Sequence, residues 1–212
     1  MTTPKVKVCG ITSAADAEMA LALGVDWIGI NGYGPSPRCV DLATARDLCN
    51  RIPAGKRVLV DVNTGAQELE RFGDLGFDAF QIHCDYETGL VDVAVWAGIV
   101  GADALWLAPK WPPMKPFPQT ILEFCETVVV DAYRRDQYGG TGSTADWPRF
   151  AEVQTLYPHK RFVLAGGLGP DNIAEAVAAS GAAFVDVNSG VESSPGVKDA
   201  SKLRALLQAI GR

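Results

Sequence analysis

The chain of 212 residues lacks the features that mark several classes of protein. No apolar run approaches the ~20 residues that cross a bilayer, and the first residues lack the apolar segment of a signal peptide. Acidic residues (25) outnumber basic ones (19), so the basic footprint that nucleic acids and anionic membranes require is missing. We therefore expect neither a membrane nor a nucleic acid as the main partner.

Metal-binding and disulfide patterns are missing too. None of the five cysteines forms a C-x-x-C pair, and His83 and His159 are not spaced as a ligand cluster. An odd number of cysteines favours reduced thiols over a disulfide framework. We expect a cytoplasmic protein without a bound metal ion. The share of apolar residues (48%) and of charged residues (21%) is ordinary for a globular domain.

What the chain does have is a unit that recurs. A glycine followed by a short alternating apolar run occurs at residues 24–30, 76–82, 101–107 and 181–187. The glycines are 52, 25 and 80 residues apart, which is close to two, one and three periods of about 26 residues. In each unit a helix is expected to end at the glycine, which suits a left-handed C-terminal residue, and a buried strand to follow it.

Other segments complete this pattern. Further strands are expected at residues 6–9, 57–62, 128–131 and 161–164. Helices are expected at residues 14–23, 42–50, 66–73, 89–98, 119–125, 145–155, 171–179 and 199–209, with Ser13 as the N-cap of the first.

Consecutive strand–helix units imply parallel strands, because each return needs a helical crossover. Eight units predict a closed (β/α)₈ barrel, the TIM barrel, as a single domain over residues 1–212. An open doubly wound sheet is the alternative, but no G-x-G-x-x-G follows the first strand.

A barrel of this kind carries its site where the strands end, and the last two strands end in glycine-rich turns. Gly166 and Gly167 follow the seventh strand, and Ser189 and Gly190 follow the eighth. Such turns let backbone N–H groups approach an anion, with helix N-termini behind them, and Pro170 suits the first turn of the helix after strand seven. We expect these four residues to bind a phosphate group.

Two reactive side chains are expected at the same edge. Cys9 ends the first strand and is followed by a glycine, and Asp131 ends the run Val128 to Val130, where a carboxylate is costly unless it has a function. A thiolate base and a carboxylic acid across a barrel mouth form a workable acid–base pair.

At these residues the chain resembles a known family. The segments K-V-C-G-I-T (7–12), S-P-R (36–38), Q-I-H (81–83), Y-G-G-T-G (138–142), A-G-G-L-G-P-D-N (165–172) and V-D-V-N-S-G-V-E (185–192) occur in order. They are similar to motifs of phosphoribosylanthranilate isomerase, the barrel enzyme of tryptophan biosynthesis.

The resemblance implies an Amadori rearrangement of N-(5′-phosphoribosyl)anthranilate, with no cofactor. It implies that Asp131 protonates the furanose ring oxygen and that Cys9 removes the proton from the adjacent carbon. Arg38 would hold the anthranilate carboxylate, because its forked guanidinium suits that task. Substrate would also contact His83, Gly140 and Gly142. We expect a small phosphorylated substrate as the partner, bound by a monomer or a homodimer, with Arg38 and the phosphate loops on opposite sides of the mouth.

The chain departs from the family pattern at five positions, which are expected at the rim near the aromatic half of the substrate: Asn31, Gly32, Gly34, Asp61 and Cys84. Two alternatives therefore stay open at this point. One is a paralogue that uses the same acid–base pair on another phosphorylated aminosugar. The other is a non-catalytic barrel that binds phosphate.

Overall fold

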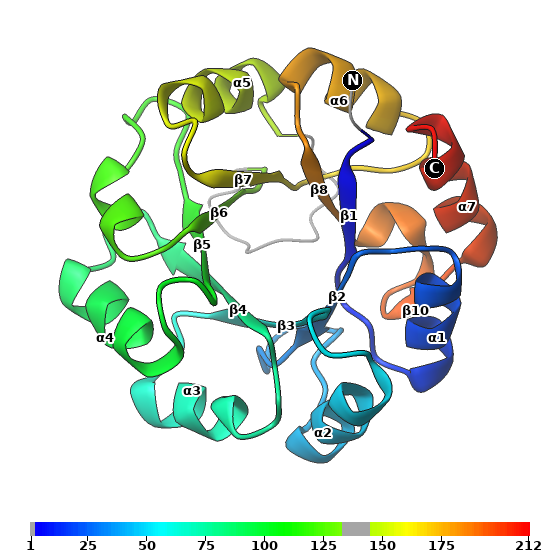
Figure 1. Ribbon diagram of the computed structural model, residues 1–212, viewed down its shortest axis with the longest axis horizontal. Helices are drawn as coiled ribbons and strands as arrows, with labels where there is room; N and C mark the ends of the chain where they lie inside the picture. The colour runs from blue at the N-terminus through cyan, green and yellow to red at the C-terminus, as the bar shows by residue number, and fades with distance from the viewer. Residues whose placement is uncertain (1–2, 133–144) are drawn as a thin grey trace.

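The computed structural model describes residues 3–132 and 145–212 and confirms the closed parallel barrel. The strands follow one another around the ring in chain order, and β8 pairs back with β1 (Figure 1). Their bounds are β1 Lys5–Val8, β2 Trp27–Asn31, β3 Arg57–Val62, β4 Ala79–Asp85, β5 Leu105–Lys110, β6 Thr127–Val130, β7 Arg161–Leu164 and β8 Phe184–Val187.

Helices cover the outside of this ring (Figure 1). Their bounds are α1 Ala14–Ala22, α2 Leu42–Arg51, α3 Ala66–Gly73, α4 Leu90–Val100, α5 Trp147–Leu156, α6 Ile173–Ser180 and α7 Ala200–Ala209. The hydroxyl of Ser13 accepts a hydrogen bond from the backbone N–H of Asp16, as expected of the N-cap of α1. Within the two described ranges, no helix has the length and apolar character needed to cross a membrane.

The prediction of an α-helix at residues 119–125 is wrong. This connection is the 3-10 helix η1, Gln119–Glu123. Pro116 and Pro118 come directly before it, and a proline has no N–H to donate. The few residues left before β6 cannot offset the cost of an α-helical nucleus, so the tighter turn forms instead.

The repeated glycines have the positive φ angles expected of them, but only Gly181 is a left-handed residue directly after a helix. Gly101 follows α4 with a ψ angle of 145°, and Gly24 and Gly76 lie beyond the C-caps of α1 and α3. The strands also begin later than predicted. The φ angles are positive at all four: 90° at Gly24, 87° at Gly76, 84° at Gly101 and 66° at Gly181. In the first two units, an aspartate between the glycine and its strand accepts hydrogen bonds from backbone N–H groups at the neighbouring strand. Oδ2 of Asp26 accepts from the N–H of Val6, and Oδ2 of Asp78 accepts from the N–H groups of Lys56 and Arg57.

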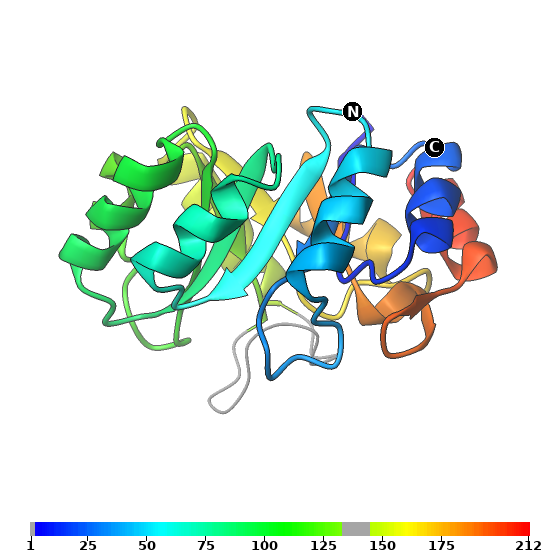
Figure 2. The same ribbon diagram turned by 90° about the horizontal axis from the view of Figure 1, so that it is seen from below.

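The barrel encloses its own apolar layer, separate from the larger core between strands and helices. Trp106 is its centre and makes edge-to-face contacts with Trp27 and Phe184, with ring centroids 5.2 and 5.6 Å apart. Figure 2 shows the barrel from the side, with both termini at one end and the strand arrows pointing to the other. The Trp106 layer therefore lies below the residues at which the strands end.

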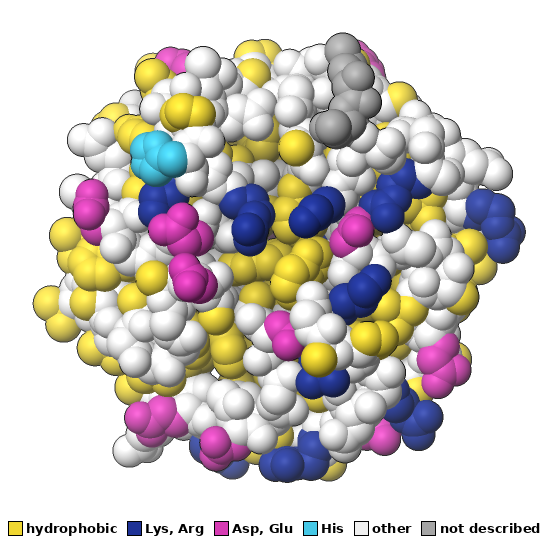
Figure 3. Space-filling model, viewed as in Figure 1, with side chains coloured by type: hydrophobic (Ala, Val, Ile, Leu, Met, Phe, Trp, Pro, Cys, Tyr) yellow, Lys and Arg dark blue, Asp and Glu magenta, His cyan; other side chains and the backbone are white. Residues whose placement is uncertain are grey.

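Figure 3 shows the end of the barrel at which the strands begin, where basic side chains gather among apolar ones near the middle. Lys5, Arg57 and Arg161 are the first residues of β1, β3 and β7. At the opposite end, the connection after β8 contains the 3-10 helix η2, Ser189–Val191, and an antiparallel hairpin of β9, Glu192–Ser194, and β10, Val197–Lys198.

Candidate active site

One cavity lies at the end of the barrel where the strands terminate, and it collects most of the residues singled out in the sequence. Its lining includes Cys9, Arg38, His83, Asp131, Gly166, Gly167 and Ser189. Cys9, Asp131, Gly166 and Ser189 lie one or two residues beyond β1, β6, β7 and β8, so the closed barrel brings them together at its mouth. Gly140 and Gly142 lie outside the described residues.

Asp131 directly follows β6 and is buried at the cavity wall. Its Oδ1 accepts a hydrogen bond of 2.7 Å from the N–H of Ala132. Burial raises the pKa of Asp131 to about 6, and the negative charge of Asp186 adds to that rise, while the Ala132 hydrogen bond and Lys7 oppose it. Gly166 approaches closely, since a Cβ there would lie 2.8 Å from Oδ1. The carboxyl group thus keeps a proton far more readily than an exposed aspartate.

Cys9 stands three strands away around the ring, at the end of β1. Its side chain is buried, and its backbone N–H donates to the carbonyl oxygen of Val187 on β8. Burial raises the pKa of the Cys9 thiol, and the charges of Lys7 and Lys198 counteract part of that rise. The thiol and the carboxyl group therefore share one cavity, and each is shifted toward its neutral form.

A buried ion pair beside Cys9 is a feature that the sequence reasoning missed. Nζ of Lys7 lies 2.7 Å from Oδ2 of Asp186, and the two residues are in register on the paired strands β1 and β8. The signal was present in the sequence: ionisable residues occupy inward positions of the buried strands V-K-V-C and F-V-D-V. Asp186 also lines the cavity.

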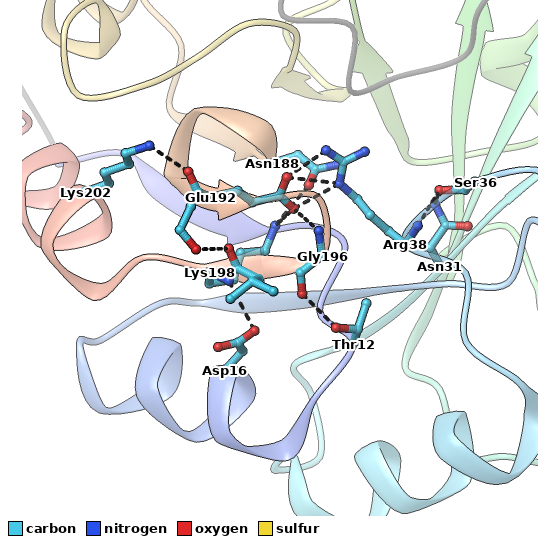
Figure 4. Close-up of polar contacts among 12 residues, drawn as sticks. Thr12, Asp16, Asn31, Ser36, Arg38, Asn188, Glu192, Gly196, Lys198 and Lys202 are labelled. Atoms are coloured by element: carbon cyan, nitrogen blue, oxygen red, sulfur yellow. Dashed lines mark hydrogen bonds and ion pairs between the residues drawn. The ribbon is translucent and has the colours of Figure 1, made fainter.

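Arg38 lies at the cavity mouth but not where the sequence placed it. Its Nε donates to Oε1 of Glu192 at 2.9 Å, and its Nη2 donates to Oε2 at 2.6 Å (Figure 4). Lys198 donates to Oε1 of Glu192 at 2.7 Å and to Oδ1 of Asn188 at 3.0 Å. Glu192 directly follows η2, so the expectation that Arg38 lies opposite the phosphate loops is wrong. Its long side chain crosses Gly10 to reach the β8 side, and a Cβ at Gly10 would lie 2.6 Å from Cδ of Arg38.

The two glycine-rich turns touch one another. A Cβ at Gly190 would lie 2.1 Å from the carbonyl oxygen of Leu168, so any larger residue would separate the turns. Asn172 braces the first turn: Oδ1 accepts from the N–H of Gly169, and Nδ2 donates to the carbonyl of Gly167. Pro170 precedes α6 by three residues, so it lies in this turn and not, as predicted, in the first turn of the helix. Ser189 and Gly190 open η2, and their N–H groups have no acceptor within that helix.

His83 lies on β4 with its ring inside the barrel. Burial, together with the charge of Lys7, lowers the pKa of His83 to about 4, so the ring is neutral at pH 7. Its Nε2 lies 3.0 Å from Nε2 of Gln81. A neutral ring can make hydrogen bonds to a substrate but carries no charge to offer it.

Three of the five departures from the family pattern face away from the cavity. Asp61 points outward and accepts a hydrogen bond from the hydroxyl of Thr64, while its neighbours Val60 and Val62 line the cavity. Cys84 belongs to the outer core, and a Cβ at Gly32 would meet Phe72 on α3. The expectation that all five lie at the rim is therefore wrong.

Asn31 does line the cavity, where its Nδ2 donates to the hydroxyl of Ser36 and its Oδ1 accepts from the N–H of Tyr33. Around Gly34, no atom of the described part of the chain lies within 4 Å of the position that a Cβ would take. In residues 3–132 and 145–212, no three His, Cys, Asp or Glu side chains are grouped to hold a metal ion.

Comparisons with known proteins agree with this geometry. Residues 6–209 match the family model described as N-(5′-phosphoribosyl)anthranilate (PRA) isomerase. An isomerase of that name from Neisseria meningitidis serogroup B is 34% identical over 210 residues, which are 98% of this chain and 97% of the relative.

Two crystal structures have the same fold. The phosphoribosyl anthranilate isomerase of Thermus thermophilus has a TM-score of 0.79 at 28% identity, with 97% of this chain and 98% of that one covered. A second isomerase structure holds reduced 1-(o-carboxyphenylamino)-1-deoxyribulose 5-phosphate. It has a TM-score of 0.76 at 24% identity, with 98% of each chain covered.

Proposed function

The chain belongs to the N-(5′-phosphoribosyl)anthranilate isomerase family, and from this we infer the reaction of its barrel mouth. It catalyses the Amadori rearrangement of N-(5′-phosphoribosyl)anthranilate to 1-(2-carboxyphenylamino)-1-deoxyribulose 5-phosphate in tryptophan biosynthesis. The observation that carries this function is that one cavity is lined by Cys9, Asp131, the turn of Gly166 and Gly167, and Ser189 of the second turn. A base, an acid and an anion site are what the rearrangement of a phosphorylated aminosugar requires.

Asp131 is the proposed general acid. Its proton passes to the furanose ring oxygen, the bond between that oxygen and the anomeric carbon breaks, and a Schiff base forms with the anthranilate nitrogen. The pKa of about 6 suits this task, because the carboxyl group retains a proton at higher pH than an exposed aspartate does. The backbone contact with Ala132 holds the carboxyl group in place.

Cys9 is the proposed general base. Its thiolate removes the proton from the carbon next to the Schiff base, which gives an enolamine that relaxes to the ketone. Because both groups are shifted toward their neutral forms, the reactive pair of thiolate and carboxylic acid is a minor state at neutral pH. In the major state at neutral pH, Cys9 is a thiol and Asp131 is a carboxylate. Both states hold one proton in total, so their ratio does not depend on pH between the two pKa values.

The two ends of the substrate have separate binding groups in this proposal. Gly166, Gly167, Ser189 and Gly190 hold the phosphate through their backbone N–H groups. Glu192 uses the Nε edge of the Arg38 guanidinium. Within residues 3–132 and 145–212, no acceptor occupies the guanidinium edge formed by Nη1 and Nη2. In this proposal that edge binds the anthranilate carboxylate. His83, Gly140 and Gly142 complete the substrate contacts, and the free cysteines fit a cytoplasmic location.

The test is a direct assay with freshly made N-(5′-phosphoribosyl)anthranilate, together with complementation of a tryptophan auxotroph that lacks this isomerase. We expect turnover in the first and growth in the second. Phosphate binding without turnover would instead identify a non-catalytic barrel. Turnover of a different phosphorylated aminosugar alone would identify a paralogue and would point to Asn31 as the altered specificity residue.

A further inference from the structure

The buried lysine of β1 has no role in the chemistry proposed so far. Lys7 has no exposed surface, and its ammonium lies inside the barrel in an ion pair with Asp186. Removing two charges from water costs several kcal/mol per ion, and apolar residues of similar volume are often at least as stabilising as a buried pair. A contribution to folding stability therefore does not explain why Lys7 and Asp186 are buried here. Their position beside Cys9 indicates a role in the chemistry.

The neighbouring strand makes room for this lysine. Gly29 on β2 faces it, and a Cβ there would lie 3.0 Å from Cε and 3.1 Å from Nζ of Lys7. The same Cβ would lie 3.1 Å from Cα of Cys9. A side chain at this position would therefore press on both Lys7 and Cys9. The lysine chain fills the space that the missing side chain leaves, directly beneath the thiol.

The ammonium faces the sulfur as well as the carboxylate. Lys7 and Cys9 are two residues apart on one face of the chain, and the Cβ position of Gly29 lies 3.1 Å from both Nζ of Lys7 and Cα of Cys9, so the two side chains are neighbours. Oδ2 of Asp186 holds Nζ, whereas Oδ1 has no hydrogen-bond partner in the described part of the chain. The carboxylate thus fixes the ammonium in place and competes with the sulfur for it.

Other ionisable groups surround this pair. His83 enters from β4, Asp131 from the end of β6, and, at the mouth, Arg38 from the loop after β2 and Lys198 from β10. His83 is neutral at pH 7, and the two mouth cations both contact Glu192. The side chains that β3 and β5 contribute to the apolar layer inside the barrel include Val60 and Ala108, and Ala165 joins them directly after β7. Lys7 is thus the cation inside the barrel that is placed to meet a charge on sulfur.

We propose that Lys7 is a positioning residue for the isomerisation: its buried ammonium, fixed by Asp186, holds the Cys9 sulfur in the ionised form that removes the proton. This rests on the assignment of Cys9 as the base. The thiolate takes the proton from the substrate carbon and becomes a neutral thiol, and Lys7 keeps its own proton throughout. Asp186 limits the effect, because it shares the ammonium with the sulfur.

Alkylation of Cys9 by iodoacetamide tests this without any substrate, because the thiolate is the form that reacts. The rate is measured from pH 7 to 11, so that a midpoint above the ordinary thiol pKa is covered, and Cys9 is followed by mass spectrometry because four other cysteines are present. In Lys7→Met we expect the midpoint of the pH profile to rise by about one pH unit or more. In Asp186→Asn we expect it to fall, because the ammonium then serves the sulfur alone. Damage to the fold would not move the two variants in opposite directions.

A matched control is Lys160→Met, which removes a lysine paired with Glu126 next to β7. Its midpoint should equal that of the wild type. With substrate, Lys7→Met should lower kcat about tenfold with KM within twofold, since a one-unit change in thiolate ionisation is a factor of ten.

A midpoint that is unchanged in Lys7→Met, or that rises in Asp186→Asn, would overturn the proposal. If Lys7→Met does not fold, the direction in Asp186→Asn decides alone. Failure of the wild type to isomerise its substrate would refute the function and leave the alkylation result standing.

Discussion

The two halves of the barrel interior differ in polarity: one is apolar and aromatic, and the other holds ionisable side chains. The lower half is the apolar layer around Trp106, Trp27 and Phe184, packed edge to face. The upper half, nearer the ends of the strands, holds Cys9, Asp131 and the ion pair of Lys7 and Asp186. The same alternation of strand residues directs both sets inward. Stability is concentrated where the strands begin and pass through the middle, and reactivity where they end.

The ionisable groups of the upper half lower the stability of the fold. A buried carboxyl group with a pKa of about 6 and a thiol with a raised pKa are groups that folding holds away from water. Burial of the apolar layer around Trp106 stabilises the fold and offsets this cost. Substitutions in the two halves should therefore separate activity from stability, and the following predictions are arranged from the largest expected effect to the smallest.

The largest effect is expected from Cys9→Ser. A hydroxyl is close to a thiol in size but far harder to deprotonate near neutral pH, so it is a poor base. We expect kcat to fall by a factor of about 10²–10⁴ or more, since that is the usual contribution of a general acid–base group. Steady-state kinetics measures the loss, and circular dichroism should show an unchanged fold. Near-full activity in this variant would refute the role of Cys9.

In the lower half the effect should appear in stability instead. Trp106 is buried against two other rings, and Trp106→Ala removes both contacts and leaves a cavity. We expect the free energy of unfolding to fall by roughly 3–5 kcal/mol, measured by denaturant titration. Per folded molecule, kcat should stay within a few-fold of the wild type. Met114→Ala, at a residue that is 95% exposed, is the control and should change stability little.

The acid and base predict the pH dependence of kcat/KM. The reactive state needs an ionised Cys9 and a protonated Asp131, and its population is constant between their pKa values. Below about pH 6, where Asp131 is already protonated, each further unit removes thiolate and should lower kcat/KM about tenfold. The alkaline limb should lie above the ordinary thiol pKa, because burial raises that of Cys9. An acid limb near pH 4 would contradict the shifted carboxyl group.

Asp131→Asn should abolish activity and increase the free energy of unfolding at neutral pH. The folded-state pKa of about 6 lies above the ordinary value of 3.8, so Asp131 favours the folded state at low pH and disfavours it increasingly as pH rises from about 4 to 6. That difference corresponds to roughly 3 kcal/mol at pH 7. We expect the asparagine variant to be inactive and more stable than the wild type by on the order of 1–3 kcal/mol at pH 7, with the gain shrinking at pH 4. Denaturant unfolding at both pH values measures it, and an equal gain at both would refute the burial argument.

The sequence predicted the local features better than the long-range ones. The positive φ angles of the turn glycines and the N-cap role of Ser13 were confirmed, because each depends on its own neighbours in the chain. The Lys7–Asp186 pair joins residues 179 positions apart and exists only because β8 closes the ring onto β1. The two ionisable residues are visible in the buried strand sequences, but their pairing is not, because only the closure of the barrel brings them together.

The predicted position of Arg38 was wrong for a similar reason. Its loop follows β2, but its side chain reaches Glu192 beyond β8, 154 positions away. Strand order around the ring fixes the backbone of a loop and leaves the direction of a long side chain open. The outward direction of Asp61, by contrast, follows from alternation along β3, since Val60 and Val62 face inward.

The smallest effect is expected at the mouth, where Arg38 joins the substrate to Glu192. Arg38→Lys keeps the charge but replaces a planar fork by a point ammonium, which cannot serve Glu192 and a substrate carboxylate along two edges at once. We expect KM for the substrate to rise about tenfold, roughly 1.4 kcal/mol, with kcat within threefold. The inhibition constant of inorganic phosphate should change less than threefold, because phosphate binds at the glycine turns and lacks the carboxylate that Arg38 is proposed to hold. Equal losses for substrate and phosphate would show instead that Arg38, through Glu192 and η2, shapes the phosphate turn itself.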